Sequence, residues 1–360
     1  MPEEYARDLK AEQRRYNNRK MLFLGIFFLC AILLFFLSLL VGSSNLSFGE
    51  SFMAVFGQGT NMAVRIVQNI RLPRAIAAAV AGAGLSIAGL MMQSTLKNPM
   101  ASPSTLGVSN AAVFGANVSI IIFAGGFFST GNHADQYFVS PNPFATSSIA
   151  FLFAMGSTLL ILGLCRIRSF APETVVLAGI ALGTVWTAVT TLLQFFATDV
   201  GLSSAVVWTF GDLGRATFKT DWIMFAVVAV GAVTFFVLRW RYNALATDEN
   251  VAKSLGVRVG VLRFVSLLMA SLITAVCVSF LGIIGFIGII CPHAMRRILG
   301  NDHRFLIPAS LISGSVLLLF ADIISTLVGH GTALPVGAVT AILGGPFFLY
   351  LIFAKKGGKA

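Results

Sequence analysis

Long apolar runs recur from residue 21 to residue 354, and they constrain the fold more than any other feature of this sequence. A helix needs about 20 predominantly apolar residues to cross the hydrocarbon core of a bilayer. Ten such stretches can be delimited: residues 21–41, 75–95, 105–125, 146–165, 174–196, 222–239, 262–281, 282–295, 306–326 and 336–354. The chain is 57% hydrophobic and 11% charged, whereas soluble domains carry about 25% charged residues. We therefore predict an all-α, polytopic membrane protein with about ten transmembrane helices.

The distribution of basic residues predicts how these helices are oriented. Ten spans place both termini on one side, and that side then carries 20 Lys and Arg residues against 5 on the other. Because cytoplasmic loops carry the excess of basic residues, we predict cytoplasmic termini. The chain divides into a tail of residues 1–20, a single transmembrane domain over residues 21–354 and a tail of residues 355–360. The first twenty residues are mostly polar, so a cleaved signal peptide is not expected.

Composition and motifs exclude several classes of function. The net charge of +11 does not indicate nucleic-acid binding, because the basic residues cluster at the ends of apolar runs, as topology signals do. Four cysteines without a CxxC pair indicate neither a disulfide framework nor a metal site. The sequence contains neither GxxxxGK followed by Ser or Thr nor HExxH, which are the P-loop and a zinc-protease motif. We expect a protein that is not an enzyme.

Ionisable residues are sparse in the apolar runs, and two of them are candidates for function. Asp322 lies late in the ninth run, where a functional carboxylate and a carboxylate that caps a helix or binds Ser325 are both open. For His293 a structural hydrogen bond is favoured over a proton relay. A secondary transporter driven by an ion gradient is the alternative class of function, and it would depend on Asp322 or His293.

Pro292 interrupts a glycine-spaced apolar segment that ends on Arg296 and Arg297. A proline inside a helix costs about 3 kcal/mol, and in a membrane the freed carbonyl must be satisfied by a neighbour or a cavity. We therefore expect a spanning helix whose inner end has a role besides crossing lipid. The backbone below the second run is also broken, because Pro99 and Pro103 lie close together there.

The longest predicted inner loop contains a candidate short helix over residues 248–255. Asp248 or Thr247 can cap its start, and Gly256 can end it. Ala252 and Leu255 are expected to share one apolar face. An amphipathic surface helix is favoured over a solvated connector.

Motifs in this order and spacing resemble the FecCD family of ABC-importer permeases, over nearly the whole chain. The matching residues are Arg71 and Arg74; Gln93, Asn98 and Pro99; Leu106, Gly107 and Ser109; Glu249, Ala252, Leu255 and Gly256; Gly285, Gly288, Pro292, His293 and Arg296; Gly300, Asp302, His303 and Arg304; Leu334, Pro335 and Gly337; and Gly344, Gly345 and Pro346.

The resemblance implies a type II importer permease in a bacterial plasma (inner) membrane. A second permease copy or a paralogue completes one translocation path between them, and two separate ATPase subunits dock below and use the ATP; no cofactor is expected in this chain. Residues 248–255 resemble the coupling element that contacts the ATPase, and the matching positions are Asp248, Glu249, Ala252, Leu255 and Gly256.

On the outer face, the resemblance implies that a substrate-binding protein docks through its carboxylates. Arg71 and Arg74 match the arginines that face those carboxylates in the cobalamin permease, and they are two of five basic residues predicted outside. The family pattern departs here, because Thr326 and Ala333 stand where Arg and Glu are usual. We hypothesise that these two charges normally act together and were lost together. The outer segment of residues 125–144 is longer than the family leads us to expect.

The translocation path is expected along the fifth span and the ends of the second and eighth spans. Candidate path residues are Met92, Gln93, Asn98, Gly179, Gly183, Gly285 and Pro292, although core packing is the favoured explanation of Met92. The family imports bulky metal chelates. We predict a ferric siderophore as substrate, with haem or cobalamin as alternatives.

Overall fold

The structure is a computed structural model, and it describes all residues except 1, 43–45, 125–141, 168–169, 330–333 and 354–360. Every regular element in the described residues is a helix. Within this described part of the chain, seven helices are long and apolar enough to cross a membrane: residues Ala11–Leu40, Asn61–Leu96, Pro143–Ile167, Pro172–Phe195, Phe218–Val237, Val259–Leu281 and His303–Val328. The predicted all-α polytopic fold is therefore confirmed.

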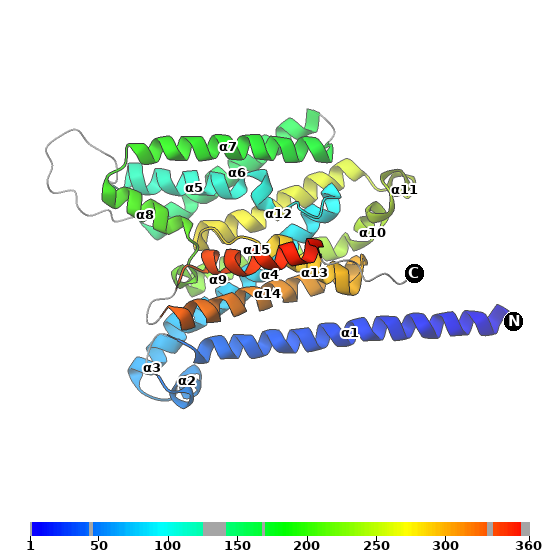
Figure 1. Ribbon diagram of the computed structural model, residues 1–360, viewed down its shortest axis with the longest axis horizontal. Helices are drawn as coiled ribbons and strands as arrows, with labels where there is room; N and C mark the ends of the chain where they lie inside the picture. Colours follow the sequence, from blue (N-terminus) through cyan, green and yellow to red (C-terminus); the bar gives the residue numbers. More distant parts are fainter. Residues whose placement is uncertain (1, 43–45, 125–141, 168–169, 330–333, 354–360) are drawn as a thin grey trace.

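The helices lie side by side with their ends at two opposite faces (Figure 1). In chain order they are α1 (Pro2–Leu40), α2 (Phe48–Val55), α3 (Asn61–Ile66), η1 (Val67–Arg71), α4 (Leu72–Leu96), η2 (Pro103–Leu106), α5 (Val108–Asn117), η3 (Val118–Phe123), α6 (Pro143–Ile167), α7 (Pro172–Phe195), α8 (Asp199–Thr209), η4 (Leu213–Arg215), α9 (Phe218–Val237), α10 (Arg239–Thr247), α11 (Glu249–Ser254), α12 (Val259–Leu281), α13 (Ile287–Leu299), α14 (His303–Val328) and α15 (Val336–Phe353). We call the face with α10 and α11 the α11 end, and the face with α2, α3 and α8 the α8 end (Figure 1).

Helix α4 lies at the centre of the bundle because its small residues let other helices approach closely. It packs against α14, α12, α13 and α9. A Cβ atom on Gly82 would collide with the Gly314 carbonyl, and one on Gly89 would collide with the Gly288 carbonyl. Substitution at either glycine would therefore push α14 or α13 away from α4.

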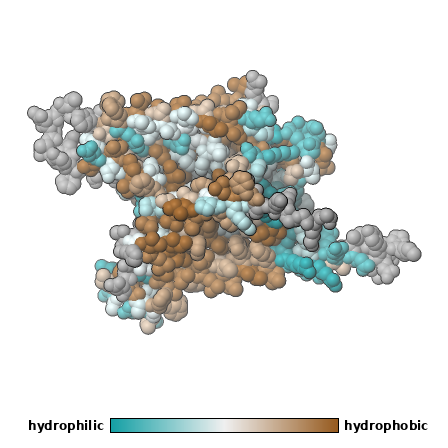
Figure 2. Space-filling view, viewed as in Figure 1, coloured by the Kyte–Doolittle hydropathy of each residue, from teal (hydrophilic) through white to brown (hydrophobic). Residues whose placement is uncertain are grey.

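The outer surface is apolar between two more polar ends. Figure 2 shows hydrophobic side chains across the middle of the visible face and hydrophilic ones toward the α11 end. Helix α1 is exposed along most of its apolar length, including Leu22, Ile26 and Leu33. A band of this kind fits a bilayer, where apolar side chains face lipid.

The predicted span over residues 282–295 is placed too early in the sequence. After α12 ends, Gly282 has φ +81° and Phe286 has φ +66°, and α13 begins only at Ile287. The positive φ values reverse the chain within five residues, so α13 starts inside the bundle and extends to Leu299. The sequence also did not predict α2, α3, α8 and α10. Most of the predicted long outer segment, residues 125–141, lies outside the described residues.

Candidate functional site

The predicted short helix of the inner loop is present as α11, with the expected cap. The side chain of Asp248 accepts a hydrogen bond from the Asn250 N–H at 2.7 Å, so Asp248 and not Thr247 caps the helix. This backbone hydrogen bond lowers the pKa of Asp248. Gly256 has φ +80°, a conformation that glycine adopts without a steric penalty, and the chain turns there toward α12.

The prediction that Ala252 and Leu255 share a face is wrong. Ala252 is 0% exposed, whereas Leu255 is 68% exposed. The reason is that α11 ends at Ser254, so helical periodicity no longer applies to Leu255. Val251 is exposed as well, and the two side chains form an apolar surface at the α11 end.

Glu249 lies in the first turn of α11 and binds two cations. Its carboxylate is 3.0 Å from Lys253 Nζ and 2.7 Å from Arg263 Nη2. The hydrogen bond from Lys253, followed by that from Arg263, lowers the pKa of Glu249. Arg263, near the start of α12, is only 5% exposed. The sequence reasoning missed Arg263, although a lone arginine at the edge of an apolar run was a signal that could have found it.

The carbonyl freed by Pro292 is satisfied by a neighbouring helix, as expected. Pro292 lies inside α13 and has no N–H to donate to Gly288, four residues earlier. The side-chain amide of Gln93, on α4, donates to the Gly288 carbonyl at 3.1 Å and to the Ile289 carbonyl at 3.3 Å. Helix α13 therefore remains continuous through its proline.

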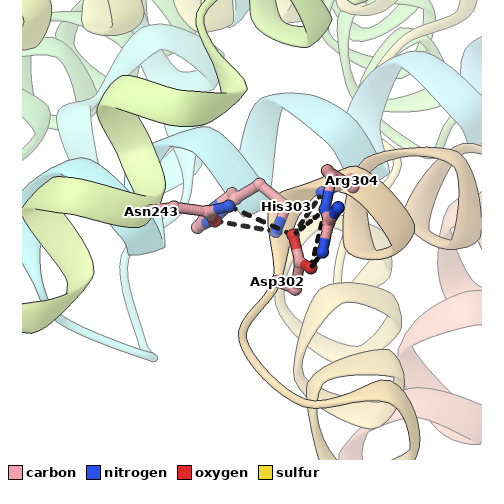
Figure 3. A network of polar contacts seen from close by, with 4 residues as sticks. All are labelled: Asn243, Asp302, His303 and Arg304. Carbon is pink, nitrogen blue, oxygen red and sulfur yellow. Dashed lines mark hydrogen bonds and ion pairs between the residues drawn. The ribbon is translucent and has the colours of Figure 1, made fainter. Parts of the chain in front are cut away.

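A polar network joins α4, α10 and α14 next to this contact. Ser94 Oγ lies 2.8 Å from His303 Nε2, and His303 Nδ1 lies 2.8 Å from Asn243 Oδ1. Asn243 Nδ2 donates to Asp302, whose carboxylate also accepts from Arg304 (Figure 3). Burial alone would raise the pKa of Asp302, but the hydrogen bonds from Arg304 and Asn243 hold it down at about 2.

At the α8 end, the two predicted docking arginines are held by other parts of this chain. Arg71 is buried, and its Nη1 donates to the carbonyls of Leu39 and Leu40 and to Ser51 Oγ. These bonds fix the end of α1 and the helix α2 against η1, directly before α4. The docking role of Arg71 stays a prediction.

Arg74 pairs with Asp322 across α4 and α14. Arg74 Nε donates to Asp322 Oδ1 at 2.7 Å, and Nη2 lies 2.7 Å from the same oxygen without hydrogen-bond geometry. Asp322 therefore binds Arg74 and not Ser325, whose hydroxyl donates to Leu334. For His293, Nδ1 is buried without a hydrogen-bond partner among the described residues, so the expected structural hydrogen bond is not seen at that nitrogen.

Several predicted path residues are enclosed in helix packing. Met92 and Gln93 are buried, and Gly179 and Gly183 bring α7 against η2 and the start of α5. In this conformation these four residues pack against neighbouring helices, which agrees with core packing for Met92; their path role stays a prediction. Asn98 lines a cleft at the α11 end together with Lys97 and Glu173. A path role for Asn98, Gly285 and Pro292 stays a prediction.

The fold defines a polytopic membrane protein, and comparisons with known proteins identify its family. A model of the FecCD transport family matches residues 30–354. An archaeal protein named as an ABC transporter permease, MJ0087 of Methanocaldococcus jannaschii, is 43% identical over 346 residues, which are 96% of this chain and 98% of that protein. The vitamin B12 import system permease protein BtuC of Shigella boydii is 34% identical, over 97% of this chain and 99% of BtuC.

A solved structure supports the same assignment. It is described as an inward-facing metal-chelate type ABC transporter; it aligns with a TM-score of 0.79 and 26% identity, over 92% of this chain and 99% of the other. The chain belongs to the FecCD transport family. It is a permease subunit of an ABC importer, and a subunit of this class works with separate ATPase subunits and a substrate-binding protein.

Proposed function

We propose that this permease imports a bulky metal chelate, and that two ATPase subunits drive it through α11. The observation that carries the proposal is the exposed apolar pair Val251 and Leu255 on a capped, charge-anchored helix outside the apolar band. Exposed apolar side chains that are grouped outside the lipid-facing band indicate a protein partner. ATP binding would move the ATPases against α11, and access to the path would alternate between the two sides.

The proposal places the α11 end in the cytoplasm, with both chain termini, in the plasma membrane of a bacterial cell. The basic residues support this orientation, since 20 of 25 lie on that side under the ten-span arrangement. The path would form between this chain and a second copy or a paralogue. The substrate-binding protein would then dock at the α8 end.

A ferric siderophore is the substrate that we propose first, from the family resemblance of the motifs. Cobalamin is the second candidate, and the observation in its favour is the full-length similarity to BtuC, a vitamin B12 permease. Haem is compatible with the same family. Purified binding protein, titrated with a ferric siderophore, haem and cobalamin, would select among the three.

Uptake into proteoliposomes tests the transport function. The permease is reconstituted with its ATPase and binding protein, and Leu255→Asp is compared with wild type. We expect uptake that requires ATP and falls at least tenfold in L255D, together with weaker ATPase binding, because a charge replaces an apolar contact. Met62→Asp is the matched control, since Met62 is 72% exposed at the α8 end, and it should keep ATPase binding. Uptake that follows a proton or sodium gradient without ATP would instead establish a secondary transporter.

A further inference from the structure

Three consecutive residues in the last turn of α4 each contact a different part of the protein. Gln93 binds α13 through the Gly288 carbonyl, Ser94 binds His303 on α14, and the Thr95 carbonyl accepts from Arg263 on α12. We call residues 93–95 the α4 junction. A helix end is suited to this task because its last carbonyls have no partner within the helix.

Arg263 connects the α4 junction to α11. Its Nη2 lies 2.7 Å from the Glu249 carboxylate on α11, while its Nε points to the Thr95 carbonyl at 3.5 Å. The second contact is long, but the negative end of α4 adds to the attraction for a cation. Since the side chain is 5% exposed, its position is set by these partners, and the rigid fork of arginine holds both at once.

Gln93 connects the α4 junction to α13 where Pro292 removes a backbone hydrogen bond from α13. The Gly288 carbonyl has lost its helical donor to Pro292, so the amide of Gln93 replaces a backbone hydrogen bond. Gly89 allows this approach, because a side chain there would strike Gly288. Arg296 Nη1 in turn lies 3.4 Å from Gln93 Oε1, which orients the amide nitrogen toward α13.

Ser94 connects the α4 junction to α14 and α10, and the contacts fix the hydrogen-bond directions for a neutral His303 imidazole. The backbone N–H of His303 donates to Asn243 Oδ1, so this oxygen is an acceptor. The ring nitrogen His303 Nδ1 faces the same oxygen and therefore carries a proton. Nε2 then accepts from the Ser94 hydroxyl. The Ser94 oxygen is left to accept from Arg296 Nη2 at 3.4 Å. A neutral His303 in one tautomer therefore holds α14 to α4.

We propose that Arg263 is a positioning residue for transport, through which a displacement of α11 reaches the α4 junction and then α13 at Pro292. The inference rests on the proposed coupling function of α11. When an ATPase moves α11, Glu249 moves Arg263, and Arg263 moves the end of α4. Helix α13 follows, because α4 supplies the hydrogen bond that keeps α13 continuous.

The test separates ATP hydrolysis from transport in the reconstituted complex. For Arg263→Gln we expect ATPase binding and ATP hydrolysis within about twofold of wild type, and substrate transported per ATP reduced about tenfold. Gln93→Met, which removes both the amide donor to the Gly288 carbonyl and the oxygen that accepts from Arg296 at similar side-chain volume, should give the same phenotype. The double variant should be no worse than either single variant, because both substitutions interrupt one route. Arg258→Gln is the matched control, since Arg258 is an exposed cation next to the start of α12.

The measurements separate failure of the inference about Arg263 from failure of the proposed transport function. ATP-independent uptake by the wild type would overturn the proposed function and this inference with it. ATP-driven uptake by the wild type, with transport per ATP unchanged in both R263Q and Q93M, would overturn this inference alone. Full additivity of the two substitutions would also overturn it, because independent structural damage adds. If R263Q does not assemble, Q93M and Arg263→Lys give the same comparison.

Discussion

The carboxylate of Asp322 and the guanidinium group of Arg74 form an ion pair at 2.7 Å between α14 and α4. Asp322 is 4% exposed and Arg74 is 15% exposed, so the pair is largely removed from solvent. Losing one partner of such a pair leaves an uncompensated buried charge.

Asp322→Asn should therefore destabilise the permease by about 3 kcal/mol, since breaking a buried pair from one side costs roughly 3–5 kcal/mol. Thermal unfolding in detergent measures the loss. The double variant Asp322→Asn/Arg74→Gln should recover part of it, because neither charge is then left alone. Equal losses in the single and double variants would show that the ion pair is not the source of the stability.

Thr326→Arg should strengthen docking of the binding protein. Thr326 lies one helical turn after Asp322 and donates to its carbonyl, so an arginine side chain there can compete for the Asp322 carboxylate. Arg74 would then be released toward an acidic partner. We expect the substrate-binding protein to bind this variant about fivefold more tightly, with an affinity that depends more steeply on salt concentration. Titration of the binding protein over the immobilised permease measures both. Unchanged affinity and salt dependence would count against the hypothesis that this position takes part in docking.

Gln93→Met should destabilise the wild type by about 1–3 kcal/mol, because the Gly288 carbonyl is left buried without a donor. The same substitution should cost clearly less in a Pro292→Ala background, where residue 292 regains an N–H that can reach that carbonyl. Unfolding measurements on the four proteins of this cycle give the coupling energy. Equal costs in both backgrounds would mean that Gln93 does not replace the missing hydrogen bond.

Asp302 should contribute stability that depends on pH. Its folded pKa of about 2 lies below the unfolded value, 3.8, so the contribution is complete above about pH 5 and is lost as the pH falls through 2. It amounts to roughly 2 kcal/mol. The difference in unfolding free energy between wild type and Asp302→Asn should shrink by about half between pH 5 and pH 3. A difference that is constant over this interval would contradict the depressed pKa.

The sequence predicted the transmembrane helices well because the bilayer imposes one simple requirement, length with apolarity. The start of α13 was wrong for a local reason. Apolar residues continue from Gly282 to Ile287 without interruption, and only the positive φ values at Gly282 and Phe286 exclude this stretch from the helix.

Side-chain contacts between distant helices were harder to predict. Asp248 was recognised as a cap because the capping bond is local, whereas Arg263 and Glu249 pair across the turn between α11 and α12. Arg74 and Asp322 are separated by 248 positions in the chain, and the pattern of either segment alone does not indicate the pair. For Pro292 the sequence predicted that the freed carbonyl needs a hydrogen-bond donor, but it did not predict that Gln93 is that donor.

Helix α4 carries the Arg74 ion pair near its first residue and the contacts of Gln93, Ser94 and Thr95 in its last turn. With 25 residues at about 1.5 Å each, it is long enough to span the hydrocarbon core of a membrane. A single helix therefore connects the contacts on one side of the bilayer with those on the other. Thermodynamic reciprocity then applies: if a protein bound outside changes how tightly the inner end holds its partners, binding of those partners inside must alter the affinity outside by the same factor.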